Sequence, residues 1–295
     1  MRKAFFQLHI AIFLAGFTGI LGRLIALNEG WLVWYRLFLS SFALWILAMV
    51  TKKLQRVTES DKLKMALIGF LIGVHWMAFY ASIKYSNVSI ALVCFSAVGF
   101  FTSIFEPIIF RKRFVLAEVF LGLMVIAGIY IIFHFDLRYK TGIILGLICA
   151  LLGALFPIYN RQFMQRMNAE TLITWEMTGG FLGVTILMPV YNNYFPAEYW
   201  FPNLGDWTWL IVLAILCTVW AFQLSSNALK KLSAFTVNLS YNLEPVYGII
   251  LAFIVYKENE QLDFSFYIGI SIIAAAVLLQ TIRVWYGRRT SPMRS

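Results

Sequence analysis

The residues with the types and spacing to do chemistry lie in one apolar run, 234–256. The run is long enough to cross a membrane, yet it contains Glu244 followed by Pro245. Its other polar candidates are Asn238, Tyr241 and Asn242. An acid at the centre of a membrane helix costs about 2.5–3.5 kcal/mol on insertion scales, so such residues usually face a wet cavity and mark a substrate or ion path. The alternative is a structural kink at Pro245, with Glu244 held by its neighbours.

Basic and aromatic candidates lie in earlier apolar runs. Arg36, beside Tyr35, is either a contact for a carboxylate or a long side chain that snorkels to the lipid headgroups, as we expect for Arg23. A third group is His75, Trp76 and Tyr80. His75 and Tyr80 are separated by about 500° of helical turn, roughly 140° apart in direction. Only part of this group can therefore face one cavity, and His75 is expected to be a satisfied buried histidine more often than a proton carrier.

Trp220, Gln223 and Asn227 recur at i, i+3 and i+7, which predicts a polar stripe on one helix face. A polar stripe inside a membrane needs protein or water to face, so we expect it to line a cavity or another helix. Pro107 and Pro157 join Pro245 as candidate kink positions. For Pro157, a moving hinge and a static kink remain equally open.

Composition sets the class of protein. Of the 295 residues, 61% are hydrophobic and 13% are charged, whereas soluble domains are about 45–50% apolar and 25% charged. The net charge of +10 does not indicate nucleic-acid binding, because the Lys and Arg residues lie between apolar runs. Cys94, Cys149 and Cys217 fall within apolar runs without C-x-x-C spacing, which argues against a disulfide framework and a zinc site. We expect a multi-pass membrane protein without a cofactor.

Ten apolar runs have the roughly 20 residues that a helix needs to cross about 30 Å of hydrocarbon. They lie at 5–27, 31–50, 63–83, 88–110, 114–133, 141–163, 171–191, 207–227, 234–256 and 264–284. The first run is longer than the apolar region of a signal peptide, so we interpret it as a retained span. The prediction is an all-α membrane protein with ten transmembrane helices.

The loops predict the orientation. If the chain starts inside, 18 of the 24 Lys and Arg residues fall on the inside and four on the outside, with Arg23 and Arg36 in spans. This asymmetry predicts a cell-membrane protein with both termini in the cytoplasm. The outside loop 192–206 has no Lys or Arg and is rich in aromatic residues.

An internal repeat organises the spans. Shifting the chain by 147 residues places Lys84-Tyr85-Ser86 on Lys231-Leu232-Ser233 and Gly122 on Gly269. Because each half has five spans, the repeats 1–135 and 136–295 must be inverted in the membrane. The two Glu-Pro pairs, at 106 and 244, are 138 apart and therefore out of register.

The depth of each acid in the predicted membrane spans indicates which one could mark a substrate or ion path. Glu244 lies about ten residues into its run, near the midplane. Glu106 and Glu176 lie nearer the inner surface, where we expect them to stay ionised and solvated. We do not expect an Arg36–Glu176 ion pair, because the inversion places these residues in opposite leaflets.

The second half carries three motifs in order: 227–234 (NALKKLSA), Leu243-Glu244-Pro245 and Tyr256-Lys257-Glu258. This pattern resembles the repeat of EamA-type transporters, in the drug/metabolite transporter superfamily. The first half matches at 81–86 (ASIKYS) and departs at 98–99 (VG) and 111–113 (RKR). The resemblance implies two inverted five-helix repeats and alternating access. It also implies that the chain moves small amphipathic metabolites, amino acids or related compounds, by export.

Two other classes of protein were weighed. An intramembrane zinc protease would show H-E-x-x-H, but His9, His75 and His134 are 66 and 59 residues apart. We therefore do not expect an enzyme. A channel remains the alternative that inverted repeats do not exclude. The expected partners are a small-molecule substrate and the lipid bilayer, not nucleic acid; coupling to protons and the oligomeric state stay open.

Overall fold

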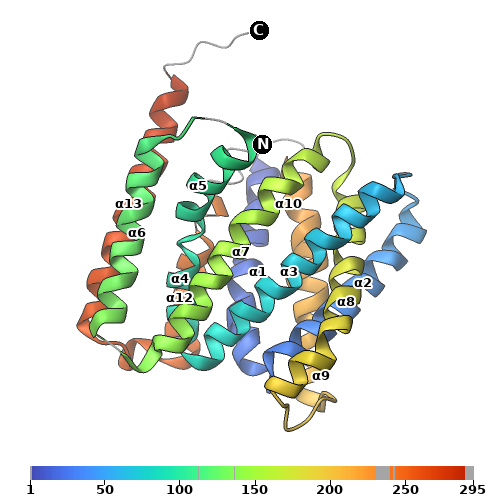
Figure 1. Ribbon diagram of the computed structural model, residues 1–295, viewed down its shortest axis with the longest axis horizontal. Coiled ribbons are helices and arrows are strands. Elements are labelled where there is room, and N and C mark those ends of the chain that lie inside the picture. The colour runs from blue at the N-terminus through green and yellow to red at the C-terminus, as the bar shows by residue number, and fades with distance from the viewer. Residues whose placement is uncertain (1, 112, 136, 230–239, 242, 290–295) are drawn as a thin grey trace.

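The computed structural model describes residues 2–111, 113–135, 137–229, 240–241 and 243–289 (Figure 1). Every regular element in these ranges is a helix. The long helices are α1 (Arg2–Leu24), α2 (Glu29–Thr51), α3 (Glu59–Tyr85), α6 (Leu116–Phe135), α7 (Lys140–Met164), α8 (Ala169–Tyr194) and α13 (Phe264–Arg289). The shorter ones are α4 (Val88–Phe95), α5 (Val98–Phe110), α9 (Leu204–Ile211), η2 (Val212–Trp220), α10 (Ala221–Leu229) and α12 (Glu244–Tyr256). Two single-turn 3₁₀ helices, η1 (Leu137–Tyr139) and η3 (Glu258–Glu260), complete the described set.

Eight stretches of helix are long and apolar enough to span a membrane, counting Val88–Phe110 and Leu204–Ser225 as one stretch each. Two shorter apolar helices, Leu116–Ile132 and Glu244–Tyr256, occupy the fifth and ninth predicted runs. The chain is thus an all-helical, multi-pass membrane protein. Within the ninth run, 234–239 and 242 lie outside the described residues.

The helices run between two ends of one bundle. The first residues of α1 and the last residues of α13 lie at the same end, which we call the terminal end (Figure 1). The other end, where α1 ends and α4 begins, is called the distal end. Asparagine or threonine N-caps start several helices by accepting a backbone N–H from the first turn: Asn28, Thr58, Asn87, Asn168 and Asn203.

Two spans depart from a regular α-helix. The fourth predicted run, 88–110, is divided into α4 and α5 at Ser96 and Ala97. The eighth contains η2, a nine-residue π-helix that the sequence did not predict. In a π-helix the hydrogen bonds run from i to i+5, and such segments often accompany functional sites. Thr218 Oγ1 donates to the Leu213 carbonyl at 3.0 Å within η2.

The predicted kinks have different outcomes. Pro245 lies in the first turn of α12, so its missing N–H costs no hydrogen bond of this helix. The kink expected there within the run 234–256 stays a prediction, because 234–239 and 242 lie outside the described residues. Pro107 lies inside α5, and α7 continues through Pro157.

Glycines let α3 and α8 pack backbone to backbone. A Cβ added at Gly180 would lie 2.7 Å from the carbonyl oxygen of Gly69, and one added at Gly73 would lie 2.7 Å from Val184 Cγ2. A Cβ added at Gly69 would overlap the backbone of Glu176. Close approach through small residues is a usual way for membrane helices to associate.

Candidate functional site

Arg36 forms the centre of a buried polar cluster. Its side chain leaves α2, and the residue is 4% exposed. Nε donates to Thr218 Oγ1 at 3.1 Å, and Nη1 donates to Tyr80 Oη at 2.7 Å. The guanidinium carbon lies 3.6 Å from the ring centroid of Trp76. Arg36 therefore joins α2, α3 and η2 inside the bundle, and the alternative that it snorkels to the headgroups is wrong.

No acidic side chain of the described residues forms an ion pair with Arg36. Its contacts are two hydroxyl groups and an aromatic face. Hydroxyl acceptors and a cation–π contact reduce the cost of burying a guanidinium but do not neutralise its charge. The cluster is therefore a ready site for an anionic group.

Glu244 is a described acid that lies close enough to Arg36 for their charges to interact. It begins α12, and Gly16 of α1 packs against its backbone: a Cβ added there would lie 2.9 Å from the Glu244 carbonyl oxygen. Twelve residues separate Glu244 from the distal end of α12, about 18 Å of helix. Glu244 and Arg36 thus lie within electrostatic reach of each other without touching.

The other members of the predicted ninth-span group are only partly described. Tyr241 has a side-chain hydrogen bond with Ser225 of α10. Asn238 and Asn242 lie outside the described residues.

The aromatic candidates divide between two sites. Trp76 and Tyr80 are four residues apart on α3, so both lie on the face that meets Arg36. His75 faces α7 instead: its Nδ1 lies 2.8 Å from the Cys149 carbonyl oxygen. His75 is 6% exposed, which makes it the satisfied buried histidine favoured by the sequence.

Tyr35 packs away from the Arg36 cluster. Its ring lies 4.9 Å from that of Trp34 and 5.4 Å from that of Trp207, measured between centroids. It therefore helps to hold α2 against α9.

The predicted polar stripe does not line the central cluster. Trp220 and Gln223 do share a face, but that face borders a groove of about 380 Å³ between α2 and the η2–α10 segment. Its other lining residues are apolar: Ala43, Ile46, Leu47, Val50, Ile215, Leu216 and Val219. Trp220 is 43% exposed, so the groove opens on the bundle surface. Of the two expected positions, a cavity or another helix, the structure shows the second, with α2 as the neighbouring helix. A face counted at 3.6 residues per turn is rotated by the wider turns of η2.

The two other acids of the predicted spans, Glu106 and Glu176, differ in exposure. Glu106 forms an ion pair of 3.0 Å with Arg161, and its side chain is 32% exposed, in agreement with a solvated position. Glu176 is only 2% exposed. The prediction that Glu176 stays solvated is wrong, because the close packing of Gly69 against its backbone covers it with α3.

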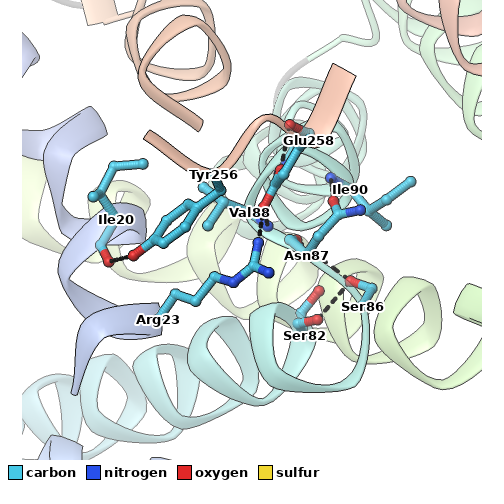
Figure 2. A network of polar contacts seen from close by, with 10 residues as sticks. Ile20, Arg23, Ser82, Ser86, Asn87, Val88, Ile90, Tyr256 and Glu258 are labelled. Carbon is cyan, nitrogen blue, oxygen red and sulfur yellow. Dashed lines mark hydrogen bonds and ion pairs between the residues drawn. The ribbon is translucent and has the colours of Figure 1, made fainter. Parts of the chain in front are cut away.

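A second polar network, at the distal end, was missed as a site by sequence reasoning (Figure 2). Glu258 is fully buried: Oε1 accepts from Val88 N at 3.0 Å and from Arg23 Nη1 at 2.6 Å. Oε2 accepts from Ser89 N at 2.8 Å and from Ser89 Oγ at 2.6 Å. Its carboxylate therefore caps the N-terminus of α4, where the helix dipole also favours negative charge.

The Glu258 network extends to α1 through Arg23 and Tyr256. The Arg23 guanidinium lies 4.3 Å from the Tyr256 ring centroid, and Tyr256 Oη donates to the Ile20 carbonyl at 2.8 Å. Arg23 is thus ion-paired with Glu258, so the expectation that it simply snorkels is wrong. The Tyr256-Lys257-Glu258 motif was the available signal. Lys257 ends α12 in the left-handed region, with φ of 52°, which turns the chain toward α4.

Two other buried carboxylates connect helices and turns of the distal end by hydrogen bonds. Asp206, 2% exposed, accepts from Ala26 N at 2.7 Å and so joins the α1–α2 turn to α9. Glu29, 7% exposed, accepts from Tyr191 Oη, which joins α2 to α8. These contacts close the distal end around α1, α2 and α4.

Comparisons with known proteins agree with this architecture. The profile of the EamA-like transporter family matches twice, over residues 2–134 and 140–282. An uncharacterized transporter of Haemophilus influenzae is 20% identical over 279 residues, 87% of this chain and 86% of that protein. The uncharacterized transporter YetK of Bacillus subtilis is 25% identical over 138 residues, 46% of this chain and 41% of that protein.

A crystal structure with 17% sequence identity has the same fold, with a TM-score of 0.64 over 99% of this chain and 100% of the other. The two profile matches cover nearly all of the sequence. The chain belongs to the EamA-like transporter family.

Proposed function

We propose that this protein is a secondary transporter of small zwitterionic metabolites, amino acids or close relatives, which it exports by alternating access. The observation that carries the proposal is the buried Arg36, which has no ion pair among the described residues. A transported carboxylate would supply the missing negative charge. Guanidinium groups suit this task because they bind carboxylates with two parallel hydrogen bonds.

Glu244 supplies the complementary charge. Its charge interacts with that of Arg36 through space, and the two side chains form no ion pair. A zwitterion would place its carboxylate on Arg36 and its ammonium group toward Glu244, while the indole of Trp76 covers an apolar side chain. A few polar anchors on apolar walls are usual for small-molecule sites. A phosphorylated ligand would require more cations at this depth.

The architecture that we propose is ten spans in two inverted five-helix repeats, 1–135 and 136–295. In support, α1 begins at the terminal end, whereas α7, the first long helix of the second half, begins at the distal end (Figure 1). Arg111 and Lys257, 146 residues apart, end α5 and α12 with the same left-handed turn, at φ of 51° and 52°. The charge asymmetry of the loops supports a protein of the cell membrane with both termini on the cytoplasmic side.

In an alternating-access mechanism, the two ends of the bundle would open in turn. The distal carboxylates are buried, whereas the terminal-end pair Arg161–Glu106 has side chains 62% and 32% exposed. We therefore infer that the Glu258 network is one of the contacts that opens when the central site turns toward the distal side. Transporters with inverted repeats rock one group of helices around such a site.

Ligand-induced thermal stabilisation of the purified protein tests the substrate class, since a ligand that binds the native state raises stability. Neutral amino acids should stabilise the wild type and the Arg138→Gln control, whose Arg138–Asp263 pair is 63% and 59% exposed. Arg36→Gln should fold and lose this response. In liposomes, the wild type and Arg138→Gln should export amino acids, whereas Arg36→Gln should not. Exchange of nucleotide sugars without any movement of amino acids would overturn the proposal.

A further inference from the structure

A second buried acid lies apart from the Arg36–Glu244 site. Glu176 is on α8, seven residues after its start at Ala169, or about 10 Å from the terminal end. It is 2% exposed, and its Oε1 atom is buried without a hydrogen-bond partner. Gly69 of α3 packs against the Glu176 backbone, which brings α3 and α8 close together at this level.

The polar side chain beside the carboxyl is Asn160 of α7, whose amide N–H is directed at it. The Oδ1 atom of Asn160 is buried and has no partner, like Glu176 Oε1. Both atoms are acceptors while the carboxylate is ionised, so neither can satisfy the other. One proton supplies the missing donor, since a neutral carboxyl group carries an O–H that an amide oxygen accepts.

Charged neighbours do not compensate a negative charge at Glu176. Lys62 of α3 bonds to Glu59 at 2.6 Å and lies over the Trp175 ring, 5.0 Å from its centroid. The other nearby charged groups have partners of their own, as the pairs Arg161–Glu106, Arg166–Asp61 and Lys53–Glu170. On α2, Arg36 bonds to Tyr80 and Thr218, and His75 of α3 bonds to the Cys149 carbonyl. None of the ion pairs of the described residues includes Glu176.

We propose that Glu176 and Asn160 form a proton-binding site, separate from the central site and exchanging with the terminal side. A proton from solvent binds the Glu176 carboxylate, and the new O–H donates to Asn160 Oδ1; no other bond changes. An unpaired carboxylate buried at a helix interface is costly, so the neutral acid is the form that fits this packing.

Release of the proton requires α7 and α8 to separate at this level. Asn160 follows Pro157 by three residues, and Pro157 interrupts the hydrogen bonding of α7. Bending at Pro157 would carry Asn160 away from Glu176 and admit water to the carboxylate. The use of this proton in transport rests on the proposed function, whereas its binding does not.

Infrared spectroscopy of the purified full-length protein in an ester-free detergent tests the site directly. At neutral pH, a carboxylic-acid C=O band should be present in the wild type and in Glu170→Gln, a control on the same helix. The Glu176 component of this band should be missing from Glu176→Gln, in which Glu244 remains. Asn160→Leu should retain the band but shift it to higher frequency, because the acid loses its acceptor.

The outcomes separate the two proposals. The same band in Glu176→Gln as in the wild type, or no shift in Asn160→Leu, would overturn the proton site. If Glu176→Gln does not fold, the frequency shift of the C=O band in Asn160→Leu is the result that supports or overturns the proton site. A band that behaves as expected in a protein that moves no amino acid would leave the proton site in place and refute the proposed substrate.

Discussion

Replacement of Glu258 by glutamine is the sharpest test of how the distal end is held. The amide keeps one oxygen, which fits best at the Oε1 position, between Val88 N and Arg23. The NH₂ group then faces Ser89, whose hydroxyl can rotate to accept but whose backbone N–H cannot. An unsatisfied buried N–H costs about 1–3 kcal/mol. Loss of the ion pair adds at most about 1 kcal/mol, because the Arg23 side chain is 37% exposed.

The expected loss of stability is therefore about 1–4 kcal/mol, which corresponds to a decrease in Tm on the order of 2–10 °C. Thermal unfolding of the purified protein in one detergent, followed by tryptophan fluorescence, measures this. Glu260→Gln is the matched control, since Glu260 lies exposed in the same 3₁₀ helix. Our reasoning fails if Glu258→Gln melts within the error of Glu260→Gln, because the network would then contribute nothing to the closure of this end.

Three further predictions follow from the same packing and charge arguments. Glu244→Gln should fold normally, lose most amino-acid transport and lose any pH dependence that remains, because it removes the titrating group; wild-type transport with the wild-type pH profile would make Glu244 a structural residue. Gly69→Ala should destabilise the protein by at least about 1–3 kcal/mol, since its Cβ would overlap the Glu176 backbone, whereas Gly99→Ala, with no atom within 4 Å of the added Cβ, should be neutral or stabilising in thermal unfolding. A cysteine at position 198, in a background without the three native cysteines, should react with impermeant reagents from outside the cell, and labelling from the cytoplasmic side alone would contradict the topology.

The central site was partly predictable. The cost of polar groups in hydrocarbon identified Arg36 and Glu244 as unusual residues, and both lie in the candidate site. The contacts of Arg36 with Tyr80 and Thr218 were not predictable, because Thr218 is an ordinary residue in an apolar run. Its role depends on a π-helix that leaves no clear mark in the sequence.

Hydrophobic length and composition alone determined that this chain is a multi-pass, all-helical membrane protein, because the cost of exposing backbone and polar groups to lipid acts on each span separately. Tertiary structure decided which way each polar side chain faces. One residue along a helix is a rotation of 100°, so a small change in helix rotation or a single π-turn moves a side chain from a cavity to a helix interface or to lipid. For this reason Trp220 and Gln223 line an outer groove. Glu176, whose position in the sequence predicted a place near the inner surface, is enclosed against α3.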